Sequence, residues 1–310
     1  MVRKNKLQEK KTKEEISFAI AIPCFNEEQN IGELLESLCS NWDSEYRPEK
    51  IAVFSSECRD GTEEIVRNLA AKSPIPIILR TERKRKGKCH AVNHLIEIIG
   101  KVDVIILVSG DVQISATNLI KMLKDFKQKN IGVVAGRVIP VCDEMNIAYR
   151  VSKVMWDLHH LMVLQAPKST EVTAFRNLGF CLDEKSLVDE AEIEWNISKR
   201  GLVIKYCDSA TIKNKAAQTL IDHVKQRTRV TAGHCGLKKR KQYTVGSMKA
   251  SVRIKALVKY FRSRKTDYFA FFILLVIEAY ILLAGYFLTF INENSDGKWA
   301  RIESAKKKFK

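Results

Sequence analysis

Two groups of acidic residues stand where carboxylates could perform chemistry. Asp111 follows the apolar run VDVIILVSG, and Asp189 and Glu190 open the segment DEAEIE. A carboxylate at the tip of a buried strand can hold Mg²⁺ or Mn²⁺ against phosphate oxygens. A partly desolvated carboxylate can remove a proton from an attacking group. Simpler roles stay open, because loop aspartates often accept backbone hydrogen bonds and acidic residues are favoured at helix N-termini.

A basic loop, ERKRKGKC, precedes Asp111 and contains Lys88. Its charge could neutralise a diphosphate, although a solvated lysine run would look the same in sequence. The loop is not a P-loop, because Gly87-Lys88 is followed by Cys89 and lacks the upstream glycine. Asp60, after SSECR, could cap a predicted helix or bind a ligand.

Alternating strands and amphipathic helices must position these residues. Strands are predicted in ISFAIAI, IAVFSS, PIPIILR, VDVIILVSGD and IGVVAGRVI, and helices with an apolar stripe follow the first three. This alternation predicts an α/β fold with a mixed, mostly parallel sheet covered by helices on both faces. Such sheets bind ligands beyond the carboxyl ends of their strands. The polar segments PCFNEE, SSECRDGT and SGDVQ are therefore expected to meet there.

Charge and cysteine content argue against several classes of protein. The chain has 53 basic and 36 acidic residues, a net charge of +17, which attracts polyanions. The basic residues concentrate in the tails, the basic loop and a segment near the C-terminus, without interleaved aromatics, so nucleic acid is not an expected partner. No CxxC pair occurs among the eight cysteines, and the histidine spacings fit no common zinc pattern.

The C-terminal part predicts attachment to a membrane. Residues Tyr268–Ile291 are apolar except for Glu278, and about 20 residues suffice to cross the hydrocarbon core. The preceding stretch is a basic amphipathic helix suited to the headgroup layer. Its apolar face carries Ile254, Leu257, Val258 and Phe261, and its basic face carries Lys255, Lys259 and Arg262.

Six segments occur in the order found in family 2 nucleotide-sugar glycosyltransferases. AIPCFNEEQNIGELLESL resembles the opening strand, loop and helix of that family, VFSSECRDGTEEIV its second signature, and RKGKCHAVN its GKGxAxN loop. SGDVQ resembles the DxD motif, DEAEIE the ED motif and QRTRV the QxxRW helix. The resemblance covers about residues 16–235. It implies a glycosyltransferase-A type (Rossmann-like) fold, an inverting sugar transfer from a nucleoside diphosphate sugar, and use of Mg²⁺ or Mn²⁺.

The resemblance also implies roles for single residues. Asp189 and Glu190 match the catalytic carboxylates, with Glu190 as the base, and Asp111 and Gln113 match residues at the metal. The acceptor and the diphosphate are implied to contact Gln226 and Arg229. The residues implied to bind the nucleotide sugar are Pro23, Phe25, Glu27, Val53, Ser55, Asp60, Lys88, Ser109, Gly110 and Arg137.

Several positions depart from the family pattern. Ser55 and Ser56 replace two aspartates of the second signature, Ser109 replaces the first aspartate of DxD, and Val230 replaces the tryptophan of QxxRW. Serine can hydrogen-bond a ribose or base but lacks the charge, which puts the choice of donor and the affinity for metal in doubt. The alternatives are a catalytically impaired transferase fold that acts as a membrane scaffold, or a nucleotidyltransferase of similar fold.

The chain is expected to divide into six parts. These are a disordered basic tail (1–15), a nucleotide-sugar-binding half (16–140), an acceptor and catalytic half (141–240), a basic amphipathic membrane-proximal segment (241–266), a transmembrane or membrane-embedded helix (267–291) and a basic tail (292–310). The expected acceptor is membrane-associated, either a lipid-linked glycan or a polyprenyl phosphate. The expected location is the cell membrane, with the catalytic domain on the cytoplasmic side and a role in cell-envelope glycan biosynthesis.

Overall fold

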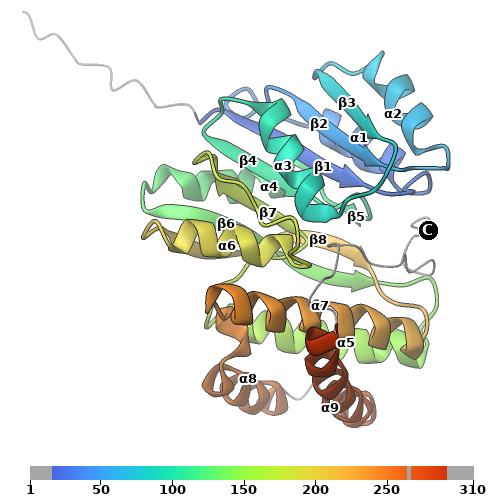
Figure 1. Ribbon diagram of the computed structural model, residues 1–310, viewed down its shortest axis with the longest axis vertical. Coiled ribbons are helices and arrows are strands. Elements are labelled where there is room, and N and C mark those ends of the chain that lie inside the picture. The colour runs from blue at the N-terminus through green and yellow to red at the C-terminus, as the bar shows by residue number, and fades with distance from the viewer. Residues whose placement is uncertain (1–15, 264–266, 292–310) are drawn as a thin grey trace, which may run out of the picture.

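The computed structural model describes residues 16–263 and 267–291, so the two predicted tails lie outside the described residues. One sheet occupies the middle of the molecule, and a group of helices forms its lower end (Figure 1). The strands are β1 Phe18–Cys24, β2 Ile51–Ser56, β3 Ile77–Glu82, β4 Val104–Val108, β5 Val112–Gln113, β6 Ile131–Val141, β7 Val172–Arg176 and β8 Val203–Lys215. The helices are α1 Ile31–Cys39, α2 Thr62–Ala70, α3 Lys88–Ile99, α4 Ala116–Leu123, α5 Ile147–Val163, α6 Asp189–Ser198, α7 Leu220–Lys241, α8 Ala250–Arg262 and α9 Tyr268–Ile291, with short 3-10 turns at Lys124–Lys127 and Gly246–Met248.

The sheet has the strand order β3-β2-β1-β4-β7-β6-β8-β5. The first four strands in this order are mutually parallel where they pair, and β6 pairs with β8 in parallel. β7 runs antiparallel to β4 and β6, and β5 runs antiparallel to β8. The predicted mixed, mostly parallel sheet is therefore confirmed. The chain proceeds from β1 out to β3 and then returns to place β4 on the other side of β1. A ligand-binding switch point consequently lies at the carboxyl ends of β1 and β4.

Helices cover both faces of the sheet, as predicted. On β1, Phe18, Ile20 and Ile22 belong to a buried cluster with α1, α2 and α4, whereas Ala19 and Ala21 belong to a second cluster with α3 and α6. Successive strand residues point to opposite faces. A strand covered on both sides is therefore apolar at every position, which explains the continuous apolar run FAIAIPC.

Three strands were not anticipated from the sequence: the two-residue β5, and β7 and β8. β7 and β8 lie beyond residue 140 yet complete the same sheet, so the sheet continues past the predicted boundary between the two halves. β8 is 13 residues long but reads VIKYCDSATIKNK, and its residues range from buried to exposed. Hydrogen bonding to β6 and β5, rather than an apolar pattern, defines it.

A layer of long helices closes the carboxyl side of β6 and β8. α5 begins at Asn146, whose side chain accepts a hydrogen bond from the Tyr149 amide, and α7 begins at Thr219, which caps the Asp222 amide. Ser152 of α5 and His223 of α7 are joined by a 3.1 Å hydrogen bond. α8 and α9 form the lowest part of the molecule (Figure 1). Within the described residues, α9 is a helix long and apolar enough to cross a membrane.

Candidate functional site

A cleft opens at the carboxyl ends of β1 and β4, where the switch point lies. Its walls are the loops after β1 and β4, the basic loop before α3, the start of α6, and the inner sides of α5 and α7. It brings together most of the residues predicted for the site. Those that line it are Pro23, Phe25, Lys88, Ser109, Gly110, Asp111, Asp189, Glu190, Gln226 and Arg229.

The outer part of the cleft contains an aromatic ring paired with a cation. The guanidinium carbon of Arg85 lies 4.2 Å from the ring centroid of Phe25. The Arg85 backbone N–H donates to the carboxylate of Glu57 at 3.0 Å, which ties the basic loop to the loop after β2. Arg85 also lines the cleft, and the sequence analysis did not single it out. Its place between lysines in the basic loop gave no sign that it differs from them.

Glu27 and Asp60 brace the loops behind the cleft. The Glu27 N–H donates to the hydroxyl of Thr62 at 2.7 Å, and Asp60 accepts from the Thr62 N–H at 3.1 Å and the Glu28 N–H at 3.2 Å. A Cβ at Gly110 would lie 3.0 Å from Cγ of Glu27, so the loop after β4 packs closely on this brace. The simpler role considered for Asp60, at the start of a helix, agrees with these contacts.

Four other predicted residues stand outside the lining of the cleft: Val53, Ser55, Gln113 and Arg137. Val53 is a residue of β2 whose side chain is fully buried in the hydrophobic core. Ser55 donates to Glu63 at 2.8 Å. Gln113 lies in β5, which pairs with β8, and its side-chain amide donates to Glu33 of α1 at 2.7 Å. Gln113 was predicted to lie at the metal with Asp111, but only Asp111 of the two lines the cleft.

The centre of the cleft is a cluster formed around one ammonium group. Lys88 is the first residue of α3, and its Nζ lies 3.0 Å from Asp189 Oδ2, 3.1 Å from Glu190 Oε1 and 3.4 Å from the Ser109 hydroxyl. Lys88 thus joins the loop after β4 to the start of α6. The DxD-like and ED-like segments, about 80 residues apart in sequence, meet through this side chain.

The cluster strongly perturbs the protonation of its members. Burial lowers the pKa of Lys88, but Asp189, Glu190 and Glu171 together raise it well above its usual value, so the side chain stays charged. Burial and the charge of Glu190 raise the pKa of Asp189 to about 7. Burial also opposes ionisation of Glu190, but Lys88 outweighs it and lowers the Glu190 pKa to about 2. Glu190 is therefore the member of the pair that is ionised near neutral pH, as a general base must be.

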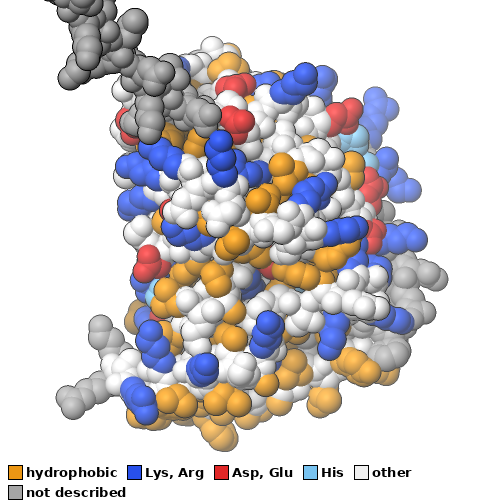
Figure 2. Space-filling view, turned by 90° about the vertical axis from the view of Figure 1, so that its left-hand side faces the viewer, with side chains coloured by type: hydrophobic (Ala, Val, Ile, Leu, Met, Phe, Trp, Pro, Cys, Tyr) orange, Lys and Arg blue, Asp and Glu red, His pale blue; other side chains and the backbone are white. Residues whose placement is uncertain are grey.

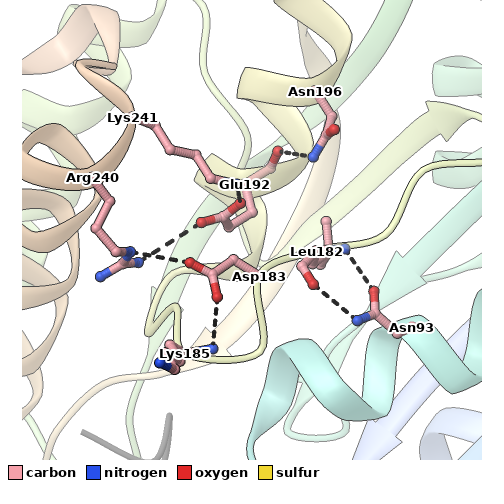
Figure 3. A network of polar contacts seen from close by, with 8 residues as sticks. All are labelled: Asn93, Leu182, Asp183, Lys185, Glu192, Asn196, Arg240 and Lys241. Carbon is pink, nitrogen blue, oxygen red and sulfur yellow. Dashed lines mark hydrogen bonds and ion pairs between the residues drawn. The ribbon is translucent and has the colours of Figure 1, made fainter. Parts of the chain in front are cut away.

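A second set of contacts fixes the N-terminus of α6 (Figure 3). The side chain of Asn93 in α3 binds both the N–H and the carbonyl of Leu182, at 2.7 and 3.0 Å. Arg240 of α7 binds Asp183 at 3.1 Å, and Lys241 binds the buried carboxylate of Glu192. The loop before α6 and the first turn of α6 are thus held between α3 and α7. This explains why Asp189 and Glu190 face the cleft.

The inner end of the cleft lies between α5 and α7 and holds residues that the sequence analysis did not assign to the site. It is lined by Trp156, His159, Lys168, Glu194, Arg227 and His234. Burial, with Lys168 as a second cause, lowers the pKa of His159 well below its usual value, and the same two causes lower that of His234 to about 3. These imidazoles are therefore neutral. No group of three metal-ligating side chains occurs in the described part of the chain.

Two acidic residues of the cleft, Asp111 and Glu171, could hold a divalent cation together with a phosphate ligand. Asp111 and Glu171, which lies in the loop before β7, both line the cleft. Burial is the main cause that raises the pKa of Glu171 to about 7, and the nearby charge of Asp111 raises it further. Mg²⁺ is usually held by one or two carboxylates, several waters and substrate phosphates. Asp111 and Glu171 fit that pattern. Glu171 was not predicted, because it belongs to none of the segments that resemble the family motifs.

A family model for glycosyl transferase family 2 matches residues 19–189. An uncharacterised protein from Methanocaldococcus jannaschii is 30% identical over 118 residues, which are 37% of this chain and 49% of that protein. The chain thus aligns with about half the length of this curated relative.

Solved structures share the fold. The mannosyltransferase PcManGT from Pyrobaculum calidifontis, in complex with GDP-Man and Mn²⁺, is similar with a TM-score of 0.62 and 16% identity, over 90% of this chain and 88% of that one. S. aureus TarS 1–349 in complex with UDP-GlcNAc is similar with a TM-score of 0.52 and 13% identity, over 80% and 73%. The glycosyltransferase-A type fold implied by the motifs is confirmed. Because the family model matches more than half of the chain, this protein belongs to glycosyl transferase family 2.

Proposed function

We propose that the protein transfers a sugar from a nucleoside diphosphate sugar to a membrane-associated acceptor, in one displacement that inverts the anomeric centre. The observation that carries the proposal is the contact of Lys88 with Ser109 on the donor side and with Glu190 at the start of α6. It brings a positive charge for a diphosphate and an ionised carboxylate for an acceptor into one cleft. Family membership and the shared fold support the same reaction class.

The donor would occupy the outer half of the cleft. The Phe25 ring and the Arg85 guanidinium form a flat, positively charged surface suited to a nucleobase and its first phosphate. Lys88 and Arg229 are the cations that would meet the diphosphate. Ser55 is fully buried and already donates to Glu63, whereas Ser56 is mostly buried but lines the cleft. Recognition of the nucleoside would therefore depend on the loops around Phe25 more than on β2.

The chemical step needs a base and a stabilised leaving group. As the acceptor oxygen bonds to the anomeric carbon, the bond from that carbon to the diphosphate breaks, and the acceptor proton passes to Glu190. A carboxylate with a lowered pKa is ionised in advance, and Lys88 keeps it so. Attack from the face opposite the diphosphate inverts the anomeric centre. The nearby Lys88 ammonium would also offset the charge that develops on the leaving diphosphate.

Asp111 and Glu171 would hold Mg²⁺ or Mn²⁺ together with the diphosphate oxygens. The bound ion would supply charge stabilisation for the leaving diphosphate. Asp111 is the residue of SGDVQ that lines the cleft, whereas Gln113 binds Glu33 on α1.

The acceptor would enter the inner half of the cleft, between α5 and α7. Trp156 and the neutral His159 and His234 suit a sugar, which stacks on aromatic rings and binds uncharged polar groups. Lys168 and Arg227 in the same region favour an acceptor that also carries negative charge. A lipid-linked glycan meets both conditions, and a polyprenyl phosphate meets the second. α9 is long and apolar enough for a membrane, which supports the location of both acceptors at the cell membrane. The catalytic domain would lie on the cytoplasmic side.

A screen of donors tests the proposal. Purified full-length protein is incubated with a panel of UDP, GDP and dTDP sugars with Mn²⁺ or Mg²⁺, and release of nucleoside diphosphate is measured with and without lipid-linked acceptors. Hydrolysis or transfer with one donor is expected, and transfer to a sugar hydroxyl should be lost in Glu190→Gln. Tight donor binding without turnover by any acceptor would favour the impaired scaffold, and release of pyrophosphate from a sugar phosphate and a nucleoside triphosphate would favour the nucleotidyltransferase.

A further inference from the structure

α9 packs lengthwise against the rest of the protein along one of its faces. Its buried or contacting residues recur every three or four positions from one end to the other: Ala270, Phe271, Leu274, Glu278, Ile281, Gly285 and Thr289. The first three belong to a buried cluster with Val151 and Val154 of α5 and Tyr260 of α8. The spacing marks a single stripe on a helix.

The middle and end of this stripe lie against α7. The single charged residue of α9, Glu278, pairs with Arg227 of α7 at 3.1 Å. A Cβ at Gly285 would lie 2.8 Å from the Thr231 side chain, so the two helices approach closely there. Further on, the Thr289 hydroxyl lies 3.4 Å from the Ala232 carbonyl. α9 therefore places its charge inward and follows α7 over about three turns.

The outward face of the same helix is apolar and exposed. It carries Phe269, Phe272, Val276, Leu283 and Phe287, which are between 60% and 75% exposed. α8 adds exposed Ile254, Val258 and Phe261. We name these eight exposed side chains the α8–α9 face. The Phe261 ring stacks 6.1 Å from that of the exposed Tyr268 at the start of α9, so the exposed faces of the two helices adjoin. Hydrophobic side chains gather at this end of the molecule, with separated Lys and Arg side chains just above them (Figure 2).

The packing of α9 is incompatible with a helix that crosses a bilayer at this position. At 1.5 Å per residue, its 24 residues span about 36 Å, enough for a hydrocarbon core of about 30 Å. However, α5 and α7 lie beside it, and their other sides line the cleft with His159, Gln226 and Arg229. A spanning α9 would carry these helices, and the charged cleft behind them, into hydrocarbon. Moving such groups out of water is strongly unfavourable.

We propose that the α8–α9 face rests on an anionic phospholipid bilayer, with α9 parallel to the membrane plane rather than across it. Eight exposed apolar side chains would enter the boundary between headgroups and acyl chains. Lys255, Lys259 and Arg262 on α8 are exposed beside them and would contact anionic headgroups. The proposal extends the membrane association proposed above. Its test measures binding and topology rather than sugar transfer, so either can fail without the other.

Vesicle flotation tests the surface. Full-length protein is mixed with phosphatidylcholine vesicles with or without phosphatidylglycerol, and the bound fraction is measured. Phe272→Glu and Leu283→Glu should each weaken binding about tenfold or more, because an apolar side chain no longer enters the bilayer. Val203→Glu, at an exposed apolar position on β8, should not change it. Circular dichroism melts of all variants check folding. Point variants are preferred to deletion of α9, which would uncover Val151 and Val154.

Topology tests the orientation. A protease-cleavable tag after Lys310 should be removed from vesicle-bound protein without detergent, because the chain would leave α9 on the side of the catalytic domain. A tag protected until detergent is added would overturn the proposal in favour of a spanning helix. Equal binding by Leu283→Glu would overturn it as well. A third outcome would also overturn it: wild-type protein that does not bind vesicles and is a dimer, with Leu283→Glu monomeric. A second copy of the chain would then cover the α8–α9 face.

Discussion

The ammonium nitrogen of Lys88 lies 3.1 Å from a carboxylate oxygen of Glu190, a residue 102 positions further along the chain. Lys88 comes from the basic loop at the start of α3, and Glu190 from the first turn of α6. The contact sets the ionisation of the carboxylate and holds a cation beside the expected leaving group. Removal of either partner should therefore have effects that differ in kind.

Glu190→Gln should lower kcat for transfer to a sugar hydroxyl by roughly 10²–10⁴-fold, because the acceptor proton has no positioned base. Transfer to a polyprenyl phosphate should slow only modestly, since a phosphate is already an anion. Donor affinity, measured by calorimetry, should change little. Asp189→Asn is the matched control. If it abolished activity while Glu190→Gln did not, the two carboxylates would exchange roles.

Lys88→Met should shift the acid limb of the pH–rate profile to higher pH. Lys88 lowers the pKa of Glu190 to about 2, so its loss raises that pKa and protonates the base at pH values where the wild type is active. The profile of kcat/KM between pH 4 and 8 measures the shift. Lys86→Met, an exposed neighbour in the same loop, should leave the profile unchanged. An unshifted profile in Lys88→Met would show that Glu190 is not the group whose ionisation limits the rate.

Asp111→Asn should lower activity by roughly 100-fold or more and weaken donor binding only where Mn²⁺ or Mg²⁺ is present. EDTA should have the same effect on the wild type. Gln113→Ala is expected to keep most of the activity, because its amide binds Glu33 and not the cleft. Full activity in EDTA would show that side chains alone meet the charge of the leaving diphosphate.

Glu194→Gln should alter how stability depends on pH. Burial raises the pKa of Glu194 from 4.5 to about 7, so its neutral form is favoured in the folded protein. A raised folded-state pKa gives stability that is present below about pH 4.5 and is lost as pH rises through 7. The Tm of the variant, relative to the Tm of the wild type, should therefore rise between pH 5 and pH 8. A constant difference in Tm across this range would contradict the prediction.

Cys58 should react with iodoacetamide at unusually low pH. The side chain of Cys24 is the main cause that lowers the pKa of Cys58 to about 6, and the thiolate is the reactive form. The backbone N–H of Asn26, the residue after Phe25, donates to the Cys58 sulfur at 3.1 Å. Cys58 therefore contacts the loop that would bind the nucleoside. Bound nucleotide should therefore slow the labelling, as measured by mass spectrometry. Cys58→Ser serves as the control for modification at other thiols.

Local sequence was a good guide to the parts of the fold that repeat a simple pattern. The apolar strands and the loops that follow β1 and β4 were predicted, and Phe25, Asp111 and Glu190 do meet in one cleft. β7, β8 and Glu171 were not identified, because their positions depend on pairing with distant strands. Likewise, nothing near Gln113 in the sequence indicates that α1 would supply Glu33 as its partner. Motif spacing identifies which loops converge, whereas the direction of each side chain depends on long-range contacts.

Arg227 belongs both to the wall of the cleft and to the ion pair with Glu278. In the described part of the chain, the layer of α5 and α7 and then α9 itself separate the interior of the cleft from the outward face of α9, a thickness of about two helix diameters, or ~20 Å. If the protein binds a bilayer through that face, the thickness of these helices would fix the distance between the membrane surface and the point at which the sugar is transferred. A glycan of several sugars would extend to that height from its lipid, whereas a phosphate at the membrane surface would have to be lifted out of it. The length of the acceptor headgroup would then be selected by the thickness of the protein as well as by the chemistry of the cleft.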